Sequence, residues 1–179
     1  MSNRKKLLYV TPHLSTGGMP QYLLKQIEHF IKDYEIQVVE VHNHSDIFVV
    51  QKNKIKELAI LHTLGEDKTE ILSIIESESP DIIHFTEVPE HYMGEHILEK
   101  IFDNSNRSYD IVVSTHGSLT EPNKIKYHPD RYVLVSEWSR RKFEHLGIDT
   151  KVWEYPIEDY QYDKDEAKDE LGFEKDWKH

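Results

Sequence analysis

The chain has 179 residues, of which 37% are hydrophobic and 31% are charged, and it contains no cysteine. This length suffices for one domain with a sizeable core, and the lack of cysteine excludes disulfides and thiolate zinc sites. The net charge of −11 argues against broad binding to nucleic acid or to anionic lipid.

The N-terminus is basic and then apolar, but its apolar run stops before Thr11-Pro12 and is too short for a signal peptide. No apolar stretch approaches the roughly 20 residues that span a bilayer. The sequence therefore predicts a soluble, cytoplasmic protein.

Short apolar runs recur along the chain, and most are continuous in Val, Ile and Leu rather than alternating with polar residues. They lie at 7–10, 36–41, 58–61, 81–85, 110–114, 132–136 and 151–155. Such runs are typical of strands that are buried on both faces of a parallel sheet.

Segments with helical periodicity lie between these runs. Residues 23–31, 71–75 and 97–102 each place apolar side chains on one helical face. Residues 46–57 fit either a short strand or a helix. The alternation predicts an α/β fold: a doubly wound, Rossmann-like, mainly parallel sheet of about seven strands with helices on both faces.

Three residues mark the expected helix ends. Pro20 falls in the first turn of its helix, where a missing N–H costs nothing. Ser136 is placed to cap a helix over 137–146, and Gly147 is placed to end it.

The composition changes near Pro156, where strand-like runs give way to an acidic, polar segment. We therefore expect a domain over 1–156, followed by an acidic linker over 157–179 that begins a second domain. The amphipathic pattern DEAKDELGFEKD in this segment predicts an exposed helix.

The stretch LSTGGMPQYL (14–23) joins the first expected strand to the first helix. Gly17-Gly18 would let the backbone approach a ligand closely at a helix N-terminus, although the same glycines could simply form a tight turn. Neither GxGxxG nor GxxxxGK[ST] is present, so the loop carries no dinucleotide or phosphate-loop fingerprint.

Further candidates follow other strands, at the sheet edge where ligands bind in open α/β folds. His116, in STHGS, could reach a substrate hydroxyl, or it could make a local loop hydrogen bond. Glu87 and Glu90 could accept hydrogen bonds from hydroxyls, act as bases or remain solvated surface acids.

The remaining histidine pairs do not match a metal motif. His42 and His44 flank one asparagine, and His91 and His96 stand in HYMGEH, which is not HExxH. We therefore expect no metal site. A nucleophile elbow, GxSxG, is also missing from the sequence.

Read together, four segments resemble the N-terminal half of family 4 glycosyltransferases. They are VTPHLSTGGMPQYLLKQIEHF, SPDIIHFTEVPEH, DIVVSTHGS and RYVLVSEWSRRKFEHLGIDTKVWEYPIED. Members of that family are retaining enzymes of the GT-B type, in which two Rossmann-like domains face each other across a cleft. The order of the segments matches over roughly residues 7–160.

The resemblance implies roles for several residues. Gly17 and Gly18 would form the glycine loop near the donor diphosphate and the acceptor, and His116 would contact the sugar at the reacting centre. Glu87 and Glu90 would face the acceptor. The donor would be a UDP- or GDP-sugar, the acceptor a carbohydrate or a lipid-linked molecule, and no metal would be required.

The resemblance also implies that important parts lie elsewhere. The family's Arg/Lys pair for the phosphates and its EX7E-type motif belong to a C-terminal domain, and this chain stops before either. We therefore expect the chain alone to be inactive. Tyr155-Pro156 stands where the family has Asn-Gly at the crossing between domains.

Two other readings remain open. The chain could be half of a nucleotide-sugar epimerase with the same type of fold, or a non-enzymatic module that binds a protein or a small ligand. Membrane contact has little support in an acidic chain, although Lys52, Lys54 and Lys56 form a small cluster in the sequence.

Overall fold

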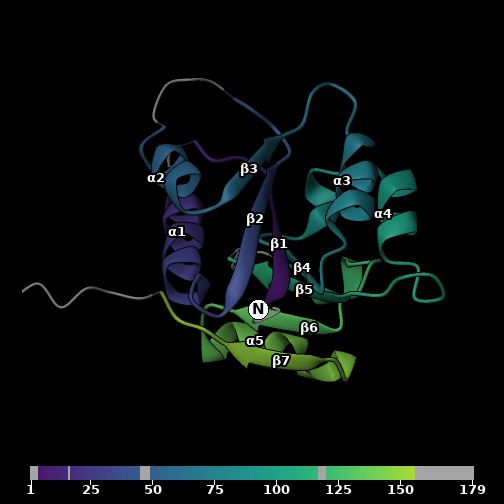
Figure 1. Cartoon of the computed structure of the whole chain (residues 1–179). Helices are drawn as coiled ribbons and strands as arrows, with labels where there is room; N and C mark the ends of the chain where they lie inside the picture. Colours follow the sequence, from purple (N-terminus) through teal and green to yellow (C-terminus); the bar gives the residue numbers. More distant parts are fainter. Residues whose placement is uncertain (1–3, 16, 45–48, 117–119, 156–179) are drawn as a thin grey trace, which may run out of the picture.

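The computed structural model describes residues 4–15, 17–44, 49–116 and 120–155, which form an α/β fold on one sheet (Figure 1). Its strands are β1 (Lys5–Thr11), β2 (Tyr34–Glu40), β3 (Ile60–Thr63), β4 (Ile82–Phe85), β5 (Asp110–Thr115), β6 (Arg131–Leu134) and β7 (Asp149–Val152). Its α-helices are α1 (Gly18–Phe30), α2 (Val50–Leu58), α3 (Glu70–Glu78), α4 (Glu95–Ile101) and α5 (Glu137–Phe143). Short 3₁₀ helices are η1 (Pro89–His91), η2 (Pro122–Lys124) and η3 (Glu144–Leu146).

The seven strands are arranged in the order β3-β2-β1-β4-β5-β6-β7, and every neighbouring pair is parallel. Strand β1 lies between β2 and β4, so the strand order reverses direction there. In open α/β sheets, this reversal point at the carboxyl ends of the strands is where ligands bind.

Helices cover both faces of the sheet. Figure 1 shows α1 and α2 together on one side and α3 and α4 on the opposite side. The α1 side buries one cluster of apolar residues, including Tyr9, Leu23 and Ile55. A second cluster, including Phe85, Ile97 and Phe143, fills the other side. Burial on both faces explains the continuous apolar runs, and the predicted fold class is confirmed.

The ambiguous segment 46–57 resolves as a helix: from residue 50 onward it lies in α2, which ends at Leu58. Strand β3 therefore begins at Ile60, two residues later than the predicted run 58–61. Strand β7 ends at Val152, earlier than the predicted run 151–155, and the residues after it lie against α1 instead.

The predicted helix ends are confirmed where the structure describes them. Ser136 accepts a hydrogen bond from the Ser139 backbone N–H at 3.1 Å, as a cap does. Gly147 follows η3 with a φ of 67°, a left-handed conformation that favours glycine. The expected boundary near Pro156 and the acidic segment 157–179 lie outside the described residues.

Candidate functional site

The glycine loop leads from β1 into α1 at the carboxyl edge of the sheet. Gly17 is the N-cap of α1 and has a φ of 130° and a ψ of 175°, a conformation almost restricted to glycine. Gly18 begins the helix with an ordinary φ. The two glycines therefore differ: the backbone conformation at position 17 requires glycine, whereas at position 18 the lack of a side chain leaves space next to Tyr155.

The part of the loop before Gly17 is held in place by β2. The buried Leu14 donates its backbone N–H to Glu40 Oε1 at 2.8 Å. His13 Nδ1 and Ser15 Oγ lie 2.8 Å apart and share a hydrogen bond. These contacts give the loop a defined position before any ligand arrives.

Glu40 is a site residue that the sequence analysis missed. Its side chain is buried at the end of β2, and Lys52 Nζ from α2 lies 2.6 Å from Glu40 Oε2. Lys52 also donates to Asn43 Oδ1 at 3.1 Å. The three lysines that lie close together in the sequence do not share one surface, because Lys52 is buried in an ion pair while Lys54 and Lys56 are exposed.

His116 lies directly after β5, beside the N-terminal half of α1. Its ring Nδ1 is 2.8 Å from Tyr155 Oη, and the edge of its ring meets the Tyr22 ring at a centroid distance of 4.8 Å. Its backbone N–H points to Glu87 Oε2 at 3.4 Å, a long hydrogen bond. The structure thus brings together two of the predicted site residues, His116 and Glu87.

The electrostatic surroundings keep His116 neutral near pH 7. Burial lowers the pKa of His116, while the charge of Glu87 and the backbone carbonyl of Thr86 oppose this effect more weakly. Burial, and then the charge of Glu87, raises the pKa of Tyr155. The hydrogen bond between His116 and Tyr155 therefore joins two uncharged side chains.

Tyr155 also joins His116 to the glycine loop. A Cβ built on Gly18 would lie 3.8 Å from Tyr155 Oη, in van der Waals contact, so Tyr155 lies directly beside the start of α1. The segment that carries Tyr155 is held by Tyr22, which donates its hydroxyl to the Trp153 carbonyl at 2.8 Å. The sequence contained one signal that pointed to Tyr155: it stands at the position where the resembling family has asparagine.

Glu90 has a different position from Glu87. Its Oε1 atom accepts hydrogen bonds from the backbone N–H groups of Lys126 and Tyr127, at 3.0 Å and 2.9 Å. Its Oε2 atom is buried and makes no hydrogen bond to the described residues. Glu90 thus fixes the loop that precedes β6, whereas Glu87 is the acid that hydrogen-bonds to His116.

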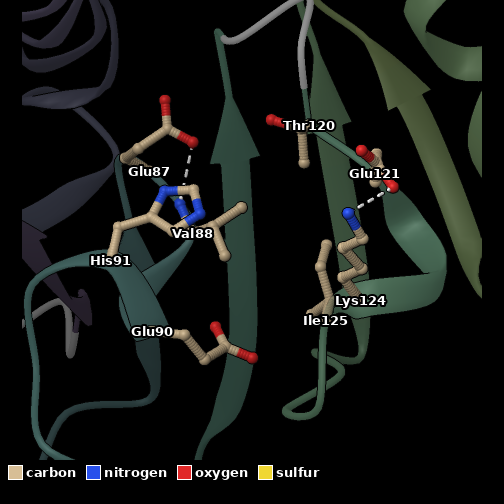
Figure 2. A pocket seen from close by; sticks show the side chains of 8 residues that line it. All are labelled: Glu87, Val88, Glu90, His91, Thr120, Glu121, Lys124 and Ile125. Carbon is tan, nitrogen blue, oxygen red and sulfur yellow. Dashed lines mark hydrogen bonds and ion pairs between the residues drawn. The ribbon is translucent and has the colours of Figure 1, made fainter.

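A cavity of about 400 Å³ lies between η1 and η2, next to Glu87. Its lining is Glu87, Val88, Glu90, His91, Thr120, Glu121, Lys124 and Ile125 (Figure 2). Lys124 Nζ lies 2.9 Å from Glu121 Oε2, so the cation of the lining is already paired. Carboxylates on an otherwise partly apolar wall suit a ligand that donates hydrogen bonds, such as a sugar with free hydroxyl groups.

The other histidines that the sequence singled out lie in separate places, and only those around His44 form ring contacts. His44 lies near both His13 and His42, at centroid distances of 5.4 Å and 5.9 Å. His91 lines the cavity and His96 lies on α4. Within 4–15, 17–44, 49–116 and 120–155, no three His, Asp or Glu residues are grouped as a metal ion would require.

One buried histidine lies beneath the site. His84 on β4 shares a hydrogen bond with Ser114 Oγ on β5 at 2.7 Å. Complete burial, with a smaller contribution from His116, lowers the pKa of His84 to about 3. His84 is therefore a neutral part of the packed interior.

No protein-family model and no curated protein matches the sequence. Solved structures are similar in fold. The lipopolysaccharide outer core galactosyltransferase WaaB, in its apo form, has a TM-score of 0.60 at 17% identity, with 85% of this chain and 46% of that chain covered. A glycosyltransferase from Rickettsia africae has a TM-score of 0.63 at 15% identity, with 97% and 51% covered.

HepE from Anabaena, solved in complex with UDP, has a TM-score of 0.62 at 13% identity, with 93% of this chain and 50% of that chain covered. This chain thus spans about half the length of these three structures. At such low identities the likeness concerns the fold alone: the chain shares its fold with about half of each of these structures.

Proposed function

We propose that this chain is the acceptor-side half of a retaining glycosyltransferase of family 4 type, a hexosyltransferase that uses a nucleotide-sugar donor. The donor is a UDP- or GDP-sugar, and the acceptor is a carbohydrate or a lipid-linked molecule. A second domain supplies the groups that hold the donor phosphates. The protein is cytoplasmic, and its reaction needs no metal.

One observation carries the proposal: His116 lies at the carboxyl edge of the sheet between Glu87, which also lines the cavity, and Tyr155, which lies next to Gly18 of the glycine loop. These groups come from three separate segments of the chain, after β1, β4 and β5. The likeness to glycosyltransferases that are about twice as long supports placing the other wall of the site in a second domain.

The chemistry of these residues suits positioning of neutral sugars. A neutral histidine donates or accepts one hydrogen bond at each ring nitrogen without adding charge. Glu87 is itself oriented, since its Oε1 atom accepts from the Val88 backbone N–H at 2.9 Å. The cavity has no unpaired cation among its described lining residues to neutralise two phosphates, so we assign leaving-group stabilisation to the proposed second domain.

Transfer of a radiolabelled sugar tests the proposal. The 179-residue chain should give no turnover with UDP- or GDP-sugars, whereas the natural full-length protein should transfer label with retention at the anomeric carbon. In that protein, His116→Ala should lower kcat/KM by about 10- to 100-fold, the effect of losing one hydrogen bond in a closed site.

His96→Ala is the matched control, because His96 is an exposed histidine on α4. Its activity should equal that of the unchanged protein. Turnover by the 179-residue chain alone would contradict the half-site proposal. Equal activity of the His116→Ala and His96→Ala proteins would contradict the role given to His116.

A further inference from the structure

The two edges of the sheet, β3 and β7, differ in their side chains (Figure 1). Each strand has four residues. Strand β7 carries Asp149 and Lys151 at alternate positions, and Asp149 Oδ2 lies 2.6 Å from Arg131 Nε. Strand β3, Ile60–Thr63, carries no Asp, Glu, Lys or Arg. Because charged side chains on an edge strand oppose pairing with a further strand, β7 is protected from such pairing and β3 is not.

The outer side of β3 has both polar backbone groups and apolar side chains to offer. Strand β3 pairs with β2 alone, and its backbone makes no other backbone hydrogen bond to the described residues. At this edge, the side chains of Leu58 and Ile60 are 36% and 57% exposed, and they line an open groove of about 380 Å³. An edge strand beside exposed apolar side chains is a template for a strand of another chain.

Four charged side chains also line this groove: the bases Arg4 and Lys56 and the acids Glu35 and Glu57. All four are exposed, and none forms an ion pair within the part of the chain that the structure describes. Their charges balance, although the whole chain carries −11. The groove is thus a neutral place on a chain whose acidic surface otherwise repels its own copies.

We propose that this edge binds a second copy of the chain, with the two β3 strands side by side. A two-fold axis perpendicular to the strands brings the same strand from each copy together in antiparallel orientation and presents the same groove from both sides. The bases of each groove then face the acids of the other, and Leu58 and Ile60 are covered. The two seven-stranded sheets become one continuous sheet across the dimer.

Light scattering and sedimentation velocity of the 179-residue chain at increasing concentration test the proposal. We expect the mass to rise from that of one chain to that of two. Ile60→Lys should weaken dimerisation by about 10- to 100-fold, because a charge would have to be buried against apolar surface. Val50→Lys is the matched control, since Val50 is 62% exposed at the start of α2, outside the groove lining. It should dimerise as the unchanged chain does.

Two charge reversals at neighbouring exposed positions test the choice of a second copy as the partner. Lys56→Glu makes the groove acidic and Glu57→Lys makes it basic, so each variant alone should repel its own copies and stay monomeric where the unchanged chain dimerises. An equimolar mixture of the two variants should dimerise again. A mixture that behaves as its separate components do would overturn the reciprocal pairing of the two grooves.

Backbone amide exchange locates the interface. In the dimer, amides of β3 should exchange more slowly than in Ile60→Lys at the same concentration, whereas amides of β7 should exchange equally in both. The mass of a single chain at every concentration would overturn the proposal, and so would a dimer in which β3 exchanges as in Ile60→Lys. Sugar transfer is not measured in these experiments, so their outcome is independent of the proposed function.

Discussion

At the scale of single residues, the two adjacent glycines make different contributions to the site. Gly17 has a backbone conformation that side chains rarely adopt, whereas Gly18 has an ordinary helical one. Sequence reasoning treated the pair as one feature, because a glycine doublet does not reveal which member needs a positive φ.

Gly17→Ala should lower the free energy of unfolding by about 1–3 kcal/mol, because a Cβ is strained at a φ of 130°. Urea denaturation monitored by circular dichroism measures this change. Gly18→Ala is the matched control and should leave stability unchanged or raise it by up to about 1 kcal/mol. Equal losses in both variants would contradict the assignment of strain to Gly17.

His84 makes the stability of the chain depend on pH. Its pKa is about 3 in the folded chain and near 6.5 when unfolded, so the unfolded state binds more protons between these values. Stability is therefore complete above about pH 6.5 and falls as the pH drops toward 3. At pH 5 the loss from this group should be about 2 kcal/mol.

Urea denaturation at pH 7.5 and at pH 5 measures the difference in free energy of unfolding. His84→Gln should reduce the difference between the two pH values, since glutamine can still bond to Ser114 and does not titrate. His96→Gln, at an exposed position, serves as the control. An unchanged pH dependence in His84→Gln would count against this role.

At the scale of elements, the buried pair of Glu40 and Lys52 connects β2, α2 and the loop after β1. Lys52 donates to one carboxylate oxygen and the Leu14 backbone N–H to the other. The pair therefore links a helix that the sequence left ambiguous to the loop at the candidate site.

Lys52→Met should destabilise the chain by about 3–5 kcal/mol, because it leaves the Glu40 carboxylate buried without its counter-ion. The double variant Glu40→Gln, Lys52→Met should recover part of this loss, since no unpaired charge remains. Thermal and urea unfolding of both proteins, with the exposed Lys54→Met as a control, give the comparison. A Lys52→Met loss no larger than that of Lys54→Met would refute the pairing argument.

How much of the fold could be predicted depends on which signal each element carries. The strands were found because burial on both faces leaves runs such as IQVVEV, and helix α1 because its apolar residues repeat on one face. Helix α2 stayed ambiguous, since Lys52 occupies a buried position that the pattern expects to be apolar. Most elements could be identified as strand or helix from their local sequence pattern. Helix α2 could not, because its buried lysine makes sense only together with its partner Glu40 on β2.

The candidate site was predictable only in part, for a related reason. Residues at the ends of strands, such as His116 and Glu87, could be found because parallel strands bring these ends to one edge. Tyr155 and Glu40 were missed as site residues, because their roles depend on contacts between segments that are distant in the chain. Periodicity and spacing carry no information about such contacts.

At the scale of the whole molecule, the net charge determines how the chain should behave toward membranes. The chain carries −11, and Lys52, one of the three lysines that lie close together in the sequence, is buried. Among the described residues, no helix is both long enough and apolar enough to cross a membrane.

Sedimentation with vesicles tests the consequence of this charge. At physiological salt, the 179-residue chain should stay in the supernatant with phosphatidylserine-containing vesicles, as with neutral ones, because an acidic surface is repelled by anionic lipid. Co-sedimentation with the anionic vesicles alone would show that a local basic surface outweighs the net charge.

The strand order has a consequence for how the sheet is assembled during synthesis. Strand β2 adds beside β1, β3 adds beside β2, and β4 adds at the free side of β1, after which β5, β6 and β7 follow outward in turn. Each strand leaving the ribosome therefore finds an open edge, and none must be inserted between two strands already paired. The nascent chain can thus extend its sheet from the centre in both directions, with β1 as the template from which both halves grow.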